Sequence, residues 1–201
     1  IADRLFVGTF HRFCLEQLRQ ENPGLTVVGP DSRQRLLKRL FADRGSAERT
    51  KLSNAIAAHC SGIQQPFSED TKIYVDELVR LNAIDLDAII PVCVQLMQAD
   101  EQFKQQVQQR VQYLFVDEFQ DVNSSQYDLV QILAEKATVF AIGDPDQAIY
   151  GFRGGDLRYF FRFAEEPDTT LLSLKTTYRL PRKIVQAAGS LICRNLICSG
   201  L

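Results

Sequence analysis

The chain is predicted to be an α/β protein that combines a parallel sheet with a long helical insertion. Two short apolar runs, at residues 113–116 and 138–142, are separated by a helical pattern, and strand-helix-strand order is typical of parallel sheets. Helical patterns fill residues 16–112, where no strand, repeat or low-complexity segment stands out. We therefore expect an α/β core with a helical insertion between two of its strands.

The first expected elements are a strand and two helices. Residues 5–8 are predicted as a short buried strand that leads into a helix over residues 10–20. A second helix is expected to begin at Pro30, with Asp31 as its N-cap and Gln34 completing a capping box. Its apolar face consists of Leu36, Leu37, Leu40 and Phe41.

Further helices complete the expected insertion. Pro91 interrupts one of them, so that helix either kinks at the proline or starts there. The predicted helices cover residues 47–59, 69–81, 86–97 and 101–111.

Helices and strands alternate in the second half of the chain. Asn123 is the expected N-cap of a helix that runs to about residue 135. Residues 156–163 are predicted as a short helix and residues 171–174 as a last strand, followed by a helix with Pro181 in its first turn. The aromatic side chains of the 156–163 helix are interpreted as core residues: Tyr159, Phe160, Phe161 and Phe163.

Two adjacent carboxylates follow the apolar run Tyr113–Val116. A buried parallel strand there would deliver Asp117 and Glu118 to the carboxyl edge of the sheet, where nucleotides bind. One carboxylate would hold Mg²⁺ through water, because this ion keeps part of its hydration shell. The other would position and deprotonate the water that attacks a terminal phosphate. A solvated strand end is the alternative interpretation of an isolated Asp-Glu pair.

A dense polar loop follows the second strand and reads GDPDQAIYGFRGG at residues 143–155. Together with YLFVDEFQD at residues 113–121, it resembles motifs III and II of the superfamily 1 DNA helicases of the UvrD, PcrA and Rep type. Three more segments match in the family's order. Residues 9–11 are similar to the TFH element, NAIDL at residues 82–86 to the ALDF stretch, and residues 177–179 to motif IV, usually written N-Y-R.

The resemblance implies a RecA-like P-loop NTPase core that uses ATP and Mg²⁺. Asp117 would hold the metal ion, mostly through water, and Glu118 would activate the attacking water. Gln147 would sense the terminal phosphate, with an exposed loop glutamine as the alternative. Arg179 would act as an arginine finger from a second motor domain. Tyr178 would stack on the adenine, with a core tyrosine as the alternative, since motif IV here begins with Thr instead of Asn.

The resemblance also implies a path for DNA. Tyr150 and Phe152 would stack on the bases of single-stranded DNA, and Arg153 would bridge the nucleotide loop and the DNA track. Thr9 and His11 would touch the DNA backbone, with a hydrogen-bonded structural histidine as the alternative. UvrD, PcrA and Rep commonly have Trp where this chain has Phe152, a departure similar to RecB-like and AddA-like branches, which leaves the subfamily open.

By the same resemblance, the chain is expected to be an internal fragment with an incomplete motor domain. The sequence contains no Gly-Lys pair of a phosphate-binding loop, which in the family lies upstream of the TFH element. Motifs V and VI would follow motif IV, so the 201-residue chain alone is predicted not to hydrolyse ATP. The expected parts are the first motor domain (1–15 and 113–166, with motifs II and III), the helical insertion (16–112) and the start of the second motor domain (167–201, with motif IV).

The composition predicts a soluble, cytoplasmic protein without a membrane span. The chain is 45% hydrophobic and 24% charged, and no run approaches the roughly 18 apolar residues that a span requires. A net charge of −2 argues against a strongly cationic nucleic-acid binder, although basic residues outnumber acidic ones at both ends. Irregularly spaced cysteines are interpreted as buried reduced thiols rather than metal ligands, and Cys193 and Cys198 could form an adventitious disulfide.

The resemblance alone implies the function of a 3′-to-5′ ATP-dependent DNA helicase or translocase in DNA repair, recombination or replication. Its expected partners are single-stranded DNA and junctions between single-stranded and duplex DNA. Two alternatives stay open: a non-hydrolysing module that binds DNA or protein, and a DNA translocase that does not separate strands. A Gly-Lys-Ser/Thr loop encoded upstream of Ile1 would exclude the first, and an unwinding assay decides the second.

Overall fold

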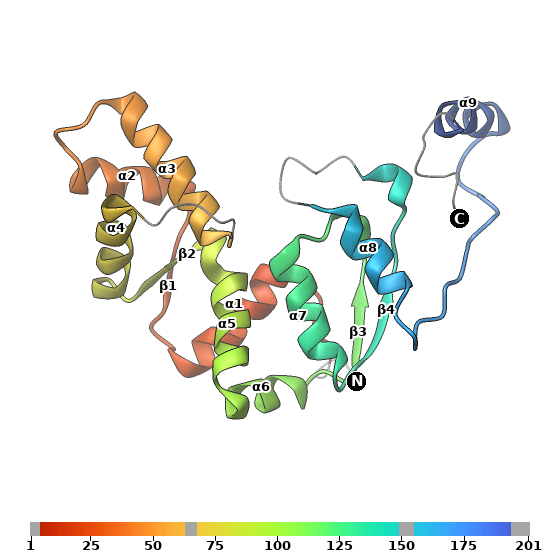
Figure 1. Cartoon of the computed structure of the whole chain (residues 1–201), viewed down its shortest axis with the longest axis horizontal. Coiled ribbons are helices and arrows are strands. Elements are labelled where there is room, and N and C mark those ends of the chain that lie inside the picture. The colour runs from red at the N-terminus through yellow and green to blue at the C-terminus, as the bar shows by residue number, and fades with distance from the viewer. Residues whose placement is uncertain (1–4, 63–67, 149–154, 194–201) are drawn as a thin grey trace. The chain divides into compact units, whose positions relative to one another are not determined.

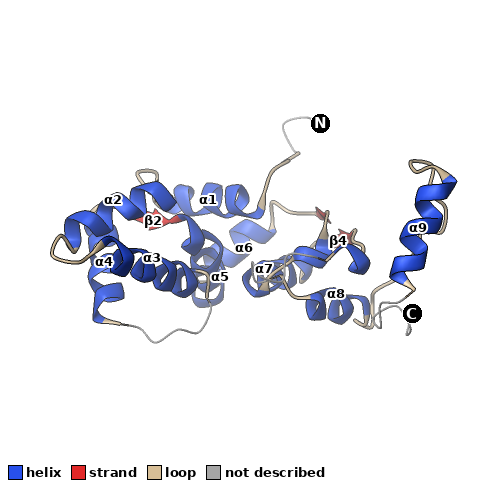
Figure 2. Cartoon of the chain, turned by 90° about the horizontal axis from the view of Figure 1, so that it is seen from above, coloured by secondary structure: helices blue, strands red, loops and turns tan. Residues whose placement is uncertain are grey.

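The computed structural model describes residues 5–62, 68–148 and 155–193 (Figure 1). Helices account for most of these residues and the strands are short (Figure 2). Contacts divide the chain into two compact units: residues 1–112 with 128–138 form the first, and residues 113–127 with 139–201 form the second. No helix in the described ranges is both long enough and apolar enough to cross a membrane.

The helices predicted for the first unit are confirmed. Several are capped by side chains in the expected manner, since Thr9 Oγ1 accepts a hydrogen bond from Arg12 N and Asp100 Oδ1 accepts one from Phe103 N. The helices are α1 (Phe10–Glu21), α2 (Pro30–Leu40), α3 (Ser46–Cys60), α4 (Glu69–Arg80), α5 (Ile89–Ala99) and α6 (Glu101–Gln108).

Two helix starts differ from the prediction. The N-cap of α2 is Gly29, without a side-chain hydrogen bond, so the predicted capping box at Asp31 is wrong. Pro30 takes the first helical position, where its missing N–H is not needed. A 3₁₀ turn, η2 (Leu86–Ala88), precedes α5, which begins at Ile89. Pro91 therefore lies in the first turn and neither kinks nor starts the helix.

The first unit also contains a small sheet that the sequence analysis missed. Strands β1 (Thr26–Val28) and β2 (Ala83–Asp85) pair in parallel, so the prediction that residues 16–112 lack strands is wrong. Three residues are too few to show an alternating pattern, and the partners lie far apart in the sequence. Residues 5–8 are not a strand either: Leu5 and Val7 are exposed, and no described strand pairs with them.

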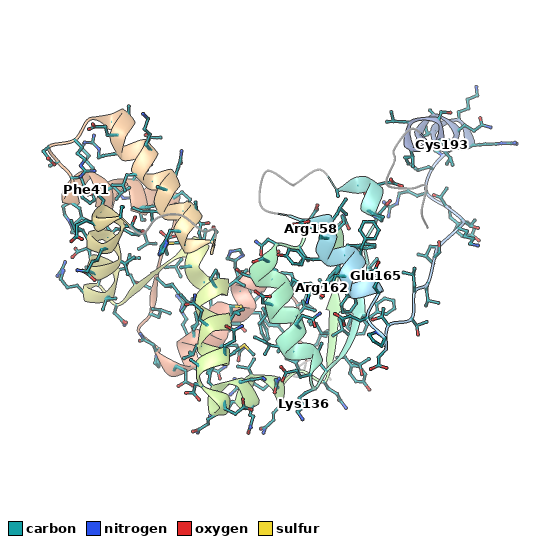
Figure 3. All side chains as sticks on the ribbon, viewed as in Figure 1. Phe41, Lys136, Arg158, Arg162, Glu165 and Cys193 are labelled. Atoms are coloured by element: carbon teal, nitrogen blue, oxygen red, sulfur yellow. The ribbon has the colours of Figure 1, made fainter. Side chains whose placement is uncertain are left out.

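One hydrophobic cluster of the first unit lies between α2, α3 and α4. Phe41, labelled in Figure 3, is buried there, and the Arg44 guanidinium lies 4.8 Å from the centre of its ring. The predicted apolar face of α2 is confirmed, with Leu40 half-buried at the margin. Other buried members of this cluster are Leu36, Leu37, Leu52, Ile56, Cys60, Tyr74 and Leu78.

The cysteine prediction holds for three of the described thiols. Cys14, Cys60 and Cys93 are free and buried, whereas Cys193, labelled in Figure 3, is free and exposed. Cys198 lies outside the described residues, and so does the predicted disulfide to it.

The predicted strand-helix-strand sequence is confirmed over residues 113–141, of which residues 128–138 count with the first unit and the rest with the second. The strands β3 (Tyr113–Val116) and β4 (Thr138–Ala141) pair with each other, and α7 (Ser124–Ala134) connects them. Thr138 N donates to Gln112 O and Ile142 N to Val116 O, so both strands advance in the same direction. Asn123 caps α7 as predicted: its Oδ1 accepts from Gln126 N at 3.0 Å, and Gln126 Oε1 accepts from Asn123 N.

The burial expected for β3 is wrong in part. Val116 is buried, but Tyr113 is 62% and Phe115 is 71% exposed. The Phe115 ring meets Phe140 of β4, with 5.9 Å between the ring centroids. Phe140 is 48% exposed as well, so the described residues leave both rings largely uncovered.

Two helices complete the second unit: α8 (Leu157–Ala164), capped by Asp156, and α9 (Arg182–Ile192). Pro181 is the N-cap of α9 and so directly precedes the first turn, in which it was predicted, and residues 194–201 lie outside the described residues. The strand predicted at residues 171–174 is wrong, because no described strand pairs with this exposed segment.

The aromatic side chains of α8 are half-buried and pack against the rest of the second unit, so their interpretation as core residues is confirmed only in part. Phe163 meets Phe119 with 5.0 Å between ring centroids, and Tyr159 stacks on Tyr127 at 4.8 Å. Arg162 of α8, labelled in Figure 3, lies 5.7 Å from the Tyr127 ring centroid. These contacts hold α8 against the turn that follows β3.

Candidate functional site

The turn after β3 places Glu118 in an unusual backbone conformation. Its φ of 53° and ψ of 43° lie in the left-handed region, which few residues other than glycine adopt. Asp117 Oδ1 accepts a hydrogen bond from Glu118 N at 2.9 Å. Ile142, just after β4, closes the turn: its N donates to Val116 O and its O accepts from Phe119 N, both at 2.8 Å. The strand ends thus hold the backbone of the turn around Glu118 in place.

A buried glutamine joins the turn after β3 to the loop after β4. Gln120 belongs to the 3₁₀ turn η3 (Phe119–Asp121) and is 2% exposed. Its Nε2 donates to Glu118 Oε2 at 2.7 Å, and its Oε1 accepts from Asp144 N at 3.0 Å. Gln120 was not among the predicted site residues, because no periodicity marks a residue in so short a turn.

The same hydrogen-bond chain continues to Gln147. Asp144 is the N-cap of the 3₁₀ turn η4 (Pro145–Gln147), and its Oδ1 accepts from Asp146 N at 3.1 Å. Asp144 Oδ2 accepts from Gln147 Nε2 at 2.6 Å. The structure therefore brings Glu118 and Gln147 into one chain of hydrogen bonds through Gln120 and Asp144.

Asp121 adds a further carboxyl group near Glu118, in addition to that of Asp117. Its Oδ1 is buried without a hydrogen-bond partner in the described residues. Burial raises the pKa of Asp121, and the negative charge of Glu118 raises it further. This site thus favours the protonated form of Asp121 more than water does.

The donor set fits a magnesium ion. Within the described ranges, no three His, Cys, Asp or Glu side chains gather as a metal centre. Mg²⁺ does not require such a cage, since it is commonly bound by one or two carboxylates together with waters and substrate phosphates. Asp117, exposed at the end of β3, offers an oxygen ligand of this kind, and neighbouring carboxylates make the surroundings negative.

Comparison with known proteins decides the family. The family model of the UvrD/REP helicase N-terminal domain matches residues 36–168. The chain belongs to this family.

Curated relatives of this UvrD/REP family chain align with almost its whole length. An ATP-dependent DNA helicase PcrA from Leuconostoc citreum is 29% identical over 97% of this chain and 30% of its own length. An ATP-dependent DNA helicase Rep from Buchnera aphidicola is 27% identical over 96% of this chain and 34% of its own length. The chain therefore spans about a third of the length of these relatives, and its membership implies a RecA-like α/β fold.

Motif IV of this UvrD/REP chain is exposed. Tyr178 is 96% exposed, and Arg179 N donates to Thr177 Oγ1 at 3.4 Å. A core position for Tyr178 is therefore wrong for the structure as described. In the described part of the chain, no hydrogen bond or ion pair links Tyr178 or Arg179 to Asp117 or Glu118.

The TFH element has structural contacts of its own. Thr9 caps α1 through its hydroxyl group, and His11 is half-buried in the first turn of that helix. Burial lowers the pKa of His11, and the charge of Asp87 opposes this shift without cancelling it. A contact of Thr9 or His11 with DNA stays a prediction.

Three predicted DNA contacts lie where the structure gives no description. Tyr150, Phe152 and Arg153 fall within residues 149–154, outside the described residues. Their roles stay predictions.

Proposed function

We propose that the protein containing this chain is an ATP-dependent DNA helicase or translocase, and that these residues form part of its motor. Membership of the UvrD/REP family supports the proposal, as do the names of the relatives. The observation that carries it is the hydrogen-bond chain from Glu118 to Gln147, because it joins a carboxylate and an amide suited to phosphate chemistry.

The predicted nucleotide-site residues each have a proposed task. Mg²⁺, when bound with ATP, neutralises charge on the phosphates. Asp117 holds the ion, mostly through water, while Glu118 orients the attacking water and takes its proton. Gln147 contacts the terminal phosphate, and its amide suits this task because it both donates and accepts hydrogen bonds. Arg179 approaches the same phosphate from a second motor domain, and Tyr178 stacks on the adenine.

The proposed DNA track uses the predicted aromatic and backbone contacts. Tyr150 and Phe152 stack on bases of single-stranded DNA, and Arg153 connects them to the nucleotide loop. Thr9 and His11 contact the DNA backbone. The proposed domain division is the one expected from the sequence, with residues 16–112 inserted into the first motor domain and residues 167–201 beginning the second.

The test uses the chain encoded by the complete open reading frame. Glu118→Gln should lower ATP turnover at least ~10²-fold while ATP binding stays nearly intact, because proton transfer and water positioning act in the transition state. Arg179→Ala should behave in the same way. Glu165→Gln is the matched control, because Glu165 is an exposed glutamate at the end of α8 and should leave turnover unchanged.

The outcomes separate the candidate functions. Unchanged turnover in both Glu118→Gln and Arg179→Ala would place the active site elsewhere. A wild-type protein that binds DNA but never hydrolyses ATP would be a binding module. DNA-stimulated ATP turnover without strand separation in an unwinding assay would identify a translocase.

A further inference from the structure

The amide of Gln120 has only one orientation that satisfies both of its neighbours. Asp144 N is a donor, so the amide oxygen of Gln120 must face it, at 3.0 Å. The amide nitrogen must then face the Glu118 carboxylate, which accepts at 2.7 Å. The donor on one side and the acceptor on the other thus decide which end of the Gln120 amide is the oxygen and which is the nitrogen, a choice that geometry alone leaves ambiguous.

Close packing holds Gln120 in this position. Its side chain is 2% exposed, so water does not replace either partner. A Cβ at Gly143 would lie 2.8 Å from Gln120 Oε1 and 3.1 Å from Gln120 N. Phe160 of α8 closes the same space, at 2.9 Å from that Cβ position. Only a residue without a side chain leaves room at position 143 for the Gln120 amide.

The loop after β4 therefore reaches Glu118 through Gln120. Asp144 holds Gln120 with its backbone and Gln147 with its carboxylate, so a displacement of residues 143–147 moves both contacts. We propose that Gln120 is a positioning residue that makes the orientation of the Glu118 carboxylate depend on the loop that carries Gln147. This inference rests on the proposed role of Glu118 in water activation, and it adds the route by which the second loop controls that role.

Two substitutions distinguish the hydrogen bond from Gln120 to Glu118 from the hydrogen bond that Gln120 accepts from Asp144 N. Gln120→Glu keeps the shape and the acceptor for Asp144 N, but it removes the donor to Glu118. Gln120→Met keeps approximate length and removes both hydrogen bonds. In the chain encoded by the complete open reading frame, each should lower kcat for ATP by roughly 10- to 100-fold, because a misplacement of about 1 Å can cost about 10²-fold. The KM for ATP should change less than about threefold.

A double-mutant cycle tests whether Gln120 acts through Glu118. Gln120→Met is measured in the wild-type and in the Glu118→Gln background by single-turnover hydrolysis with enzyme in excess. We expect no further loss in the Glu118→Gln background, since the group that Gln120 positions is already neutral there. An equal factor in both backgrounds would overturn the inference, because Gln120 would then act independently of Glu118.

Gln108 provides the matched structural control. It is also buried, at 4% exposure, and its Nε2 donates to Ile132 O at 2.7 Å and to Glu135 at 3.1 Å. Gln108→Met should lower the melting temperature and leave kcat unchanged. If Gln120→Met fails to fold, the isosteric Gln120→Glu decides, and an unchanged kcat in that variant overturns the inference. A loss of turnover with Glu118→Gln but none with either Gln120 variant would refute this inference alone, whereas no loss with Glu118→Gln would refute the proposed function.

Discussion

Arg33 of α2 and Asp85 of β2 form a bidentate ion pair inside the first unit. Arg33 Nε lies 2.8 Å from Asp85 Oδ2, and Arg33 Nη2 lies 2.6 Å from Asp85 Oδ1. The side chains are 4% and 0% exposed. Tyr74 OH donates to the same carboxylate at 2.6 Å, and Asp87 accepts from Arg33 at the edge of the cluster. Charged hydrogen bonds thus join α2, α4 and β2.

The ionisation of this cluster follows from its partners. Burial by itself would lower the pKa of Arg33, but hydrogen bonds to Asp85 and Asp87 outweigh it and raise the pKa. Burial raises the pKa of Tyr74, and its hydrogen bond to Asp85 raises it further. Arg33 therefore stays charged and Tyr74 stays neutral across the pH range in which the protein is handled.

Asp85→Ala should strongly destabilise the first unit. Removal of the carboxylate leaves the Arg33 charge buried with Asp87 as its remaining acidic partner, and breaking a buried pair typically costs about 3–5 kcal/mol. Urea unfolding followed by circular dichroism measures the loss. The control is Asp87→Ala, which should cost less because the side chain of Asp87 is 34% exposed. Equal losses for the two variants would contradict the ranking.

Gly143→Ala should strain the contact between the two loops of the candidate site. The added Cβ meets Gln120 Oε1 at 2.8 Å and the Gln120 backbone N at 3.1 Å, and a rotamer change cannot relieve the second contact. Overpacking of this kind typically costs about 1–3 kcal/mol. The matched control is Gly189→Ala in α9, where nothing lies within 4 Å of the new Cβ and stability should not fall. Thermal melts of both variants decide whether the close approach at Gly143 matters.

Asp121→Asn should make stability less dependent on pH. The folded-state pKa of Asp121 is raised above its ordinary value of 3.8, so the folded state holds its proton to higher pH than the unfolded state does. Stability is therefore lost as the pH rises from the unfolded to the folded pKa, and it stays lower above that interval. The Asn variant should be the more stable protein at neutral pH, and its advantage should vanish as the pH falls below 3.8.

Denaturant unfolding in magnesium-free buffer at several pH values measures this effect. Asp76→Asn is the control, because Asp76 is 66% exposed and pairs only loosely with Lys72, at 3.7 Å. A difference between wild type and Asp121→Asn that stays constant over the whole pH range would show that ionisation of Asp121 does not cause it.

Phe152→Ala tests the proposed DNA track in the complete open reading frame. If a base stacks on this ring, the affinity for single-stranded DNA should fall by roughly 1–3 kcal/mol. The slope of affinity against salt should change little, because stacking releases no phosphate counterions. Arg153→Ala is the contrast: if the bridging arginine reaches a DNA phosphate, its loss should reduce that slope by about one.

The competing outcome for Phe152 is a packing role. Truncation of a core phenylalanine costs about 3–5 kcal/mol of fold stability. A sharply lower melting temperature with normal DNA affinity would assign Phe152 to packing and leave Tyr150 as the stacking candidate in this loop.

The sequence by itself determined the local elements and the family. Caps and apolar spacing located α1 to α8 to within about a turn, because these signals act between residues a few positions apart. Asn123 was recognisable as a cap for the same reason. The apolar runs at residues 113–116 and 138–142 likewise located β3 and β4, and the motifs that follow them identified the candidate nucleotide site.

Only the tertiary structure decided which distant residues meet. The strands β1 and β2 are too short to carry a pattern, and their pairing depends on chain segments more than fifty residues apart. Gln120 became part of the candidate site because Asp144 N and the Glu118 carboxylate lie on opposite sides of its amide. Likewise, Asp85 stands in a segment singled out for its resemblance to a motif, yet its partner Arg33 was not apparent. A polar side chain shows its type in the sequence, but its hydrogen-bond partners are chosen by packing, since burial makes every unpaired donor or charge costly.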